Sequence, residues 1–244
     1  MVVENLVGLT AARCLSVLIS RLRNIDTIRL ATCAPLPLLQ ERFEMTEVER
    51  AICENANDLR RSLGLSFWSA ALLQLSDKPD ASRLLDAAMT HVSLHGKERS
   101  LSWSEAVGGG IERACADFQV GAAASLTMLS EVVLRDGSLG HIPMLDFHSP
   151  KSVGNQWIVE AAAKKLLPEG AIIVESGESY HAYGMKILTQ PEFEKFLGTA
   201  LLLAPIVDRA YIAHQLIEGR CALRLTPGGG KSQVPTVVAV LLKG

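Results

Sequence analysis

The sequence lacks the marks of several common protein classes. Its five cysteines are widely spread and form no CxxC pair or Cys/His cluster, which argues against a zinc site and favours reduced, mostly buried thiols. Its apolar runs are short and broken by charges, and the start carries Glu4 in place of a basic segment, so we expect neither a membrane span nor a signal peptide. We therefore expect a cytoplasmic protein with no membrane partner.

Charge and motif patterns exclude further functions. A formal net charge of −2 over 244 residues offers no general surface for nucleic acid or membranes. A Ser-His-Asp hydrolase is not supported, because the chain has no GxSxG elbow. The run at 227–232 ends in Lys231-Ser232 but lacks the first glycine and the following helix of a P-loop. We predict a flexible hairpin turn there, which leaves Lys231 able to contact a polynucleotide backbone.

What is present is an ordinary globular composition, with 48% hydrophobic and 20% charged residues. Residues 3–22 are apolar on most sides and predict a buried helix. A capping box at Thr46–Glu49 predicts a second helix ending at Gly64, and two more follow, from Ser66 and from an N-cap at Asp80. We predict that residues 1–97 form a helical region without visible chemistry.

Two histidines of this region, His91 and His95, are spaced to share one helical face. A metal site needs further ligands, and the neighbouring sequence supplies none. We therefore expect surface or capping histidines.

The second part of the chain, residues 98–244, predicts a sheet domain. Residues 99–103 suit a strand, residues 125–134 suit a strand or a helix, and Asp136-Gly137 predicts a turn. From residue 141 onward we expect strands over 141–147, 171–174, 180–186, 220–226 and 234–242, and helices over 152–167, from 189, and over 208–217. The predicted fold class is α+β, with the helical region and the sheet domain either separate or continuous.

Candidate site residues lie on these predicted strands. Asp146 and His148 are two residues apart and so face the same side, which permits shared contact with a metal ion or a phosphate. The same spacing also suits two polar residues at a strand end. His181 follows a glycine turn, and its place alone suits a solvent-facing strand histidine. The guanidinium group of Arg224 suits bidentate binding of a phosphate, or a cross-strand ion pair with a glutamate.

Three segments in this order carry a resemblance to a known family. They are Leu145-Asp146-Phe147-His148, Ser179-Tyr180-His181 after Ser176-Gly177, and Ala222-Leu223-Arg224-Leu225-Thr226. From residue 144 to 242 the chain resembles the archaeo-eukaryotic primase (primase-polymerase) superfamily. The resemblance implies an RRM-like sheet and a first motif whose acids hold divalent metal. It also implies that His181 contacts nucleotide phosphate, for which a donor imidazole is suited. We expect Ser179, Arg224 and Lys231 to add further contacts with nucleotide or nucleic-acid phosphate.

The sequence departs from the family at two acids. His148 stands where the second acid of the first motif is expected, and Ala222 stands where the acid of the third motif is expected. Asp146 and His148 would then be both the catalytic residues and the metal ligands, and this pair suits a softer ion such as manganese or zinc better than magnesium. The sequence leaves open whether another acid replaces the missing ligand. The candidates are Glu175, Glu178, Asp208 and Glu218.

Two functions follow from the resemblance. The first is binding of a nucleoside triphosphate or nucleic acid, with weak metal-dependent nucleotidyl transfer. The second is a catalytically inactive module that assembles with protein partners in a larger nucleic-acid-handling system. We prefer the first function, through Asp146, His148, His181 and Arg224, while the missing acids favour the second.

Overall fold

The computed structural model describes residues 6–243 except 36, 38, 76–77, 79–80 and 119–122. The chain divides into two compact units, one of residues 1–35 and 93–244, the main unit, and one of residues 36–92, the insertion. The insertion lies between two strands that pair with each other, β1 (Ile25–Cys33) and β2 (His95–Ser102). The predicted boundary at residue 97 therefore differs from the structure, because β1 belongs to a sheet of the main unit. The fold class is α+β, as predicted.

The insertion is helical. Its helices are α2 (Leu39–Arg42), α3 (Glu47–Leu63), α4 (Phe67–Leu75) and α5 (Arg83–Met89). The predicted capping box is confirmed, since Thr46 Oγ1 accepts from the Glu49 backbone N at 3.2 Å and a Glu49 carboxylate oxygen accepts from the Thr46 N at 2.8 Å. The expected N-cap at Asp80 lies outside the described residues. The helical face expected for His91 and His95 is wrong, because α5 ends before His91 and His95 begins β2.

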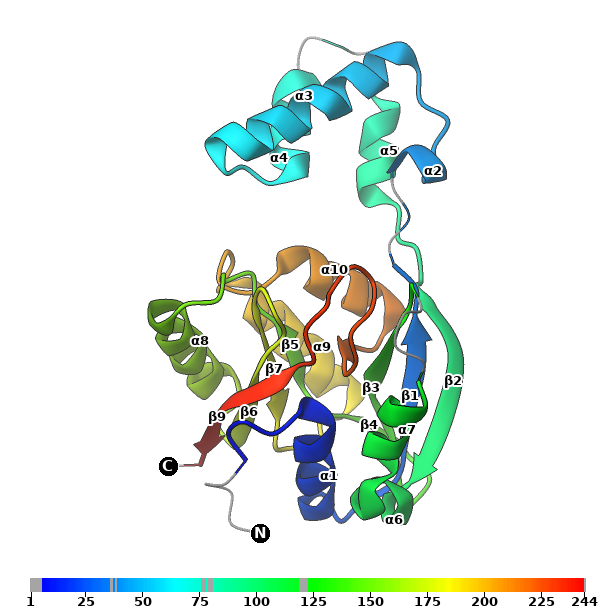
Figure 1. The fold of residues 1–244 in the computed structure, drawn as a ribbon, viewed down its shortest axis with the longest axis vertical. Helices are drawn as coiled ribbons and strands as arrows, with labels where there is room; N and C mark the ends of the chain where they lie inside the picture. Colours follow the sequence, from blue (N-terminus) through cyan, green and yellow to red (C-terminus); the bar gives the residue numbers. More distant parts are fainter. Residues whose placement is uncertain are drawn as a thin grey trace. The chain divides into compact units, whose positions relative to one another are not determined.

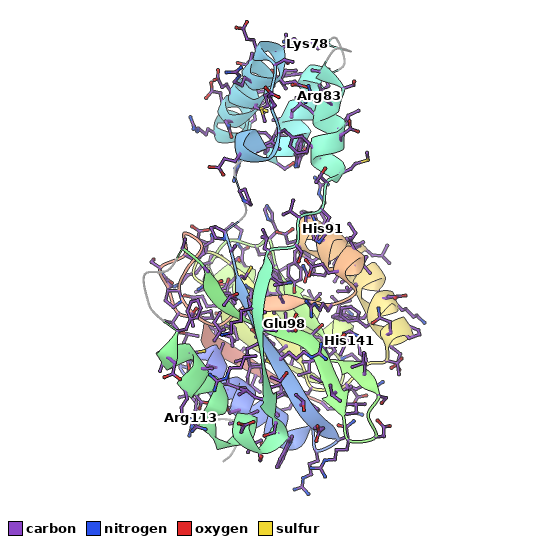
Figure 2. All side chains as sticks on the ribbon, turned by 90° about the vertical axis from the view of Figure 1, so that its right-hand side faces the viewer. Lys78, Arg83, His91, Glu98, Arg113 and His141 are labelled. Atoms are coloured by element: carbon purple, nitrogen blue, oxygen red, sulfur yellow. The ribbon has the colours of Figure 1, made fainter. Side chains whose placement is uncertain are left out.

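The main unit contains two antiparallel sheets (Figure 1). The first has the order β2-β1-β3-β4, and β8 also pairs with β3; the second has the order β5-β7-β6-β9. The further strands are β3 (Ser125–Leu134), β4 (Leu139–His141), β5 (Met144–Asp146), β6 (Gly170–Glu175), β7 (Tyr180–Gly184), β8 (Ala222–Arg224) and β9 (Thr236–Leu242). Strand β2 lies at one edge of the first sheet and carries Glu98 (Figure 2), which pairs with Arg220 at 2.8 Å.

Helices of the main unit pack on these sheets around one continuous apolar core. They are α1 (Ala11–Arg21), α6 (Trp103–Glu105), α7 (Ile111–Asp117), α8 (Val153–Leu166), α9 (Gln190–Leu201) and α10 (Arg209–Glu218), with a kinked segment η3 (Ala106–Gly110) between α6 and α7. Helix α1 begins later than predicted because Thr10 caps it and forms a β-bridge with Thr236. None of the helices within the described ranges combines the length and the apolar composition needed to cross a membrane.

Several predicted elements are confirmed. Residues 125–134 form a strand, β6 and β7 are antiparallel neighbours, and a turn follows β3 at the predicted Asp136-Gly137. Helix α9 begins with a capping box between Thr189 and Glu192, and Asp208 caps α10 by accepting from the Tyr211 N at 2.9 Å.

Two strand predictions are wrong. The strand expected over residues 141–147 is two strands, β4 and β5, which belong to different sheets. Pro143 lies between them and has no backbone N–H with which to continue a ladder. The hairpin expected around residues 227–230 does not join paired strands, because β8 pairs with β3 while β9 pairs with β6. The chain thus crosses between the sheets three times, between β4 and β5, between β7 and β8, and between β8 and β9.

Candidate functional site

The centre of the candidate site is formed by Asp146 and His181 on adjacent strands. Asp146 ends β5 and lies directly opposite His181 of β7 in the antiparallel register. Asp146 Oδ1 lies 3.6 Å from His181 Nε2, which is too long for a hydrogen bond. Asp146 Oδ1 and His181 Nδ1 are both buried and have no hydrogen-bond partner in the structure. The two side chains are therefore neighbours, but each keeps a buried polar atom without a hydrogen bond.

Burial keeps both groups uncharged near neutral pH. Loss of solvation, aided by the negative charge of Asp208, raises the pKa of Asp146 from 3.8 to about 8. Loss of solvation, aided by the positive charge of Arg224, lowers the pKa of His181 from 6.5 to about 3. The pair is therefore a carboxylic acid beside a neutral imidazole and not an ion pair.

Asp208 is the acid that the structure brings to Asp146. Its backbone N donates to the Asp146 carbonyl oxygen at 2.9 Å, next to a β-bridge between Phe147 and Val207. One of its carboxylate oxygens caps α10, and the other lies 3.9 Å from Nδ1 of His148. Asp208 therefore connects the two residues of the first predicted motif.

The other three acids that the sequence left open are engaged elsewhere. Glu175 pairs with Lys151 at 2.5 Å, Glu178 pairs with Lys231, and Glu218 lies 2.8 Å from Nδ1 of His95. In the sequence, Asp208 is one of four candidate replacement acids. The local pattern around it shows only that it precedes a helix. The contact between residues 147 and 207 that places it beside Asp146 is not encoded by any local pattern.

Arg224 is committed to backbone carbonyls. One guanidinium nitrogen donates to the carbonyl oxygens of Thr226 and Gln233, both at 2.7 Å, and the other donates to the carbonyl oxygen of Ser176. The predicted cross-strand pair with a glutamate is not formed, since Glu175 and Glu178 pair with lysines. Arg224 ties the loop at 176–179 to the segment at 226–233, and its charge acts on His181 from there.

The remaining predicted residues lie around this centre. The Oγ of Ser179 is 3.3 Å from that of Ser176 in the loop before β7. Lys231, at the far end of the glycine turn, pairs with Glu178 of that same loop. The side chain of His148 is 73% exposed, and its Nδ1 lies 3.9 Å from a carboxylate oxygen of Asp208. Strands β5, β7 and β8 thus carry Asp146, His181 and Arg224, two loops carry Ser179 and Lys231, and His148 is exposed to solvent.

The described residues contain no group of three His, Cys, Asp or Glu side chains arranged to hold a metal ion. Two carboxylates and an imidazole are nevertheless present in Asp146, Asp208 and His148, and the Oδ1 atom of Asp146 is unpartnered. Oxygen-seeking cations such as magnesium are often bound by one or two carboxylates and completed by substrate phosphates and water. In donor chemistry the residues fit a cation that arrives with a phosphate ligand.

Comparison with known families agrees with the resemblance. A family model described as "AEP-like: Archaeo-eukaryotic primase 1D-like" matches residues 111–236, more than half of the 244 residues. The chain therefore belongs to the archaeo-eukaryotic primase superfamily. Within that superfamily it belongs to the family described as archaeo-eukaryotic primase 1D-like. No curated protein and no solved structure matches the chain significantly.

The matched range runs from the start of α7 to the start of β9. It contains every residue of the candidate site, namely Asp146, His148, Ser179, His181, Asp208, Arg224 and Lys231.

Proposed function

We propose that this site binds the phosphates of a nucleoside triphosphate or of a nucleic-acid end, together with a divalent cation. The observation that carries the proposal is the buried, unpartnered Oδ1 of Asp146, held between His181 and Asp208. An unsatisfied buried polar atom costs about 1–3 kcal/mol, and strongly perturbed carboxyl groups cluster at functional sites. A cation and its phosphate ligand would satisfy Asp146 and remove the repulsion from Asp208.

Asp146 and Asp208 would hold the cation, with His148 beside Asp208. Manganese accepts both carboxylate and imidazole ligands, so it suits this set better than magnesium does. Bound there, the ion would neutralise the charge of a triphosphate and lower the pKa of an attacking hydroxyl. The proton of Asp146 must leave when the ion binds, because only the carboxylate is a ligand.

The phosphate contacts would come from His181, Ser179 and Lys231. The neutral imidazole of His181 donates through one ring nitrogen, and the Ser179 hydroxyl also donates. Lys231 would exchange the Glu178 carboxylate for a phosphate. Arg224 would position the two loops, since both of its terminal nitrogens already donate to carbonyl oxygens.

Nucleotidyl transfer at this site would be weak. Two carboxylates can hold one ion, whereas two-metal transfer stabilises both the attacking and the leaving oxygen. Replacement of the expected second acid by His148 removes one hard oxygen ligand.

The test is thermal melting of the whole chain with manganese, with ATP, and with both. A ligand that binds only the folded state raises the melting temperature, and we expect the rise to require both additions. Asp208→Asn is the sharpest variant, because asparagine caps a helix as well as aspartate does and only the charge is lost. We expect Asp208→Asn, Asp146→Ala and His181→Ala each to abolish most of the shift.

The matched control is Asp26→Asn, which removes one acid from an exposed position of β1 and should leave the shift unchanged. If manganese with ATP raises the melting temperature of Asp146→Ala and Asp208→Asn as much as that of the wild type, the cation binds elsewhere. That result would contradict the proposed cation ligands.

A second function is favoured by a specific observation. Arg224 and Lys231, two of the expected phosphate ligands, are both engaged within the protein. If neither manganese with ATP nor manganese with an oligonucleotide shifts the melting temperature at about millimolar ligand, the inactive interaction module becomes the better proposal.

A further inference from the structure

A cavity lies in the main unit at the other end of the strand that carries His181. Its volume is about 490 Å³, which is within the usual range for a small-molecule site. It is lined by the end of α8, the start of β6, the residues after β7 and one face of α9. Met185, which lines the cavity, follows the end of β7 and lies four positions after His181, so the two sites are roughly 13 Å apart along the chain at about 3.3 Å per residue.

The floor of this cavity is apolar. Leu166, Leu167, Met185, Leu188 and Phe196 line it, and all five are buried or half-buried. Such a floor favours a ligand with a hydrocarbon or aromatic body, because burial of apolar surface contributes about 25 cal/mol per Å². A nucleic-acid backbone would gain little from this floor.

The rim of the cavity is cationic. Lys165, Lys186 and Lys195 are exposed at its edge together with Glu169 and Glu192. Both glutamates are already occupied. Glu169 pairs with Lys243 at 2.7 Å, and Glu192 caps α9 through one oxygen while its other oxygen lies 3.6 Å from Lys186.

The two remaining ammonium groups are available. Within the described part of the chain, neither Lys165 nor Lys195 forms an ion pair with a carboxylate. They come from different helices, the last turn of α8 and the middle of α9, so an anion between them would join two elements. Exposed lysines above an apolar floor match a molecule with a negative head and an apolar body.

We propose that this cavity is a binding site for a small organic anion with an aromatic or aliphatic body and a carboxylate, sulfonate or phosphate head. The body would lie on Phe196 and Met185, and the head would lie between Lys165 and Lys195. The site is separate from the Asp146 centre, and the proposal does not depend on nucleotide binding there.

The probe for the test is 1-anilinonaphthalene-8-sulfonate, whose fluorescence rises when its rings enter an apolar site. We expect saturable binding to the full-length folded protein. Lys165→Glu and Lys195→Glu should each weaken it at least fivefold. Lys164→Glu is the matched control, because it makes the same charge change on the same turn of α8 at an exposed residue outside the cavity lining. It should change the affinity less than twofold.

A second pair of variants tests the shape of the cavity. Thr199→Trp adds a ring at the cavity rim and should block the probe. Gly198→Trp adds the same ring one residue earlier, outside the lining, where an added Cβ meets no atom within 4 Å. It should leave binding intact. Circular dichroism melts of all variants establish that each is folded.

Several outcomes would overturn the proposal. Equal weakening by Lys164→Glu and Lys165→Glu would mean that the probe senses only general charge. Wild-type binding in Thr199→Trp would place the probe elsewhere. Equal affinity for the uncharged analogue N-phenyl-1-naphthylamine would remove the requirement for an anion. Loss of probe binding in Asp146→Asn would also contradict a separate site, whereas failure of the manganese and ATP test would leave this proposal standing.

A free organic anion and an anionic lipid both have a negative head and an apolar body. One further experiment distinguishes them. If the wild type co-sediments with phosphatidylglycerol vesicles and Lys165→Glu does not, the ligand is a lipid. That result would overturn the proposal of a small organic anion. Absence of co-sedimentation together with probe binding would support it.

Discussion

At the scale of single residues, Asp146 and His181 contribute opposite pH dependences to stability. Above pH 3.8 the unfolded chain has released the proton of Asp146, while the folded protein keeps it up to a pKa of about 8. The contribution of Asp146 to stability therefore falls as pH rises between these values. His181 has a folded pKa of about 3 against 6.5 in the unfolded chain, so its contribution rises with pH between those values.

The two pH dependences add, and the sum of the two contributions to stability can be tested. They nearly cancel between about pH 4 and 6.5, and above that Asp146 alone acts until about pH 8. We expect Asp146→Asn to remove this fall, so that the variant gains on the wild type as pH rises from 6.5 to 8, at no more than about 1.4 kcal/mol per pH unit for one proton. Urea unfolding at several pH values measures it.

The control is Asp26→Asn, in which an exposed acid of β1 loses its charge. Parallel pH profiles for the wild type and Asp146→Asn would show that Asp146 titrates as an ordinary carboxyl group and would contradict the argument.

The sequence named most residues of the candidate site but not their relations. Asp146 and His181 were named for their places in strand motifs, and the register of β5 and β7 places them opposite each other. Asp208 could not be singled out, because it reaches Asp146 through a bridge between residues 147 and 207 that are 60 positions apart. Arg224 was expected as a phosphate ligand, and only the structure shows three carbonyl oxygens around its guanidinium group.

At the scale of elements, local signals predicted helices better than strands. Caps at Thr46, Thr189 and Asp208 are short-range patterns, and the helices follow them. Strand β1 was missed although it is central in its sheet, since its partners lie 62 to 109 residues further along the chain. Pro143 was present as a signal for the break between β4 and β5, because proline interrupts a ladder.

The turn after β8 provides a prediction at this scale. Gly228 has φ +137°, and a Cβ there would lie 2.2 Å from the Ala124 carbonyl oxygen. We expect Gly228→Ala to lower the free energy of unfolding by at least about 2 kcal/mol, from backbone strain together with the steric clash. It should also weaken any ligand that depends on Lys231, which the same turn presents. Urea unfolding and the manganese and ATP melt measure the two effects.

Gly229→Asn is the comparison for this variant. Gly229 has φ +58°, a left-handed conformation that asparagine tolerates, and an added Cβ meets nothing within 4 Å. Its cost should stay below about 1 kcal/mol. Equal costs at the two positions would mean that the turn relaxes and that contact with Ala124 does not restrict Gly228.

At the scale of the whole molecule, the insertion interrupts a pair of neighbouring strands. Cys33 of β1 lies opposite His95 of β2, and the Ala34 backbone N donates to the Leu94 carbonyl oxygen at 3.0 Å. The two ends at which residues 36–92 enter and leave are therefore already joined as in a β-hairpin. The core of the main unit is continuous without any residue of the insertion, which has a small apolar cluster of its own.

The main unit should therefore fold without the insertion. Replacing residues 36–92 by Asn-Gly between Pro35 and Ser93 closes β1 and β2 with a turn sequence typical of hairpins. We expect cooperative melting within a few degrees of the wild type, lower helical circular dichroism, and the same stabilisation by manganese with ATP, because every candidate site residue lies in residues 146–231. An unfolded or aggregated product would show that the main unit needs the insertion to fold. A folded product that has lost the ligand shift would instead place part of the binding function in residues 36–92.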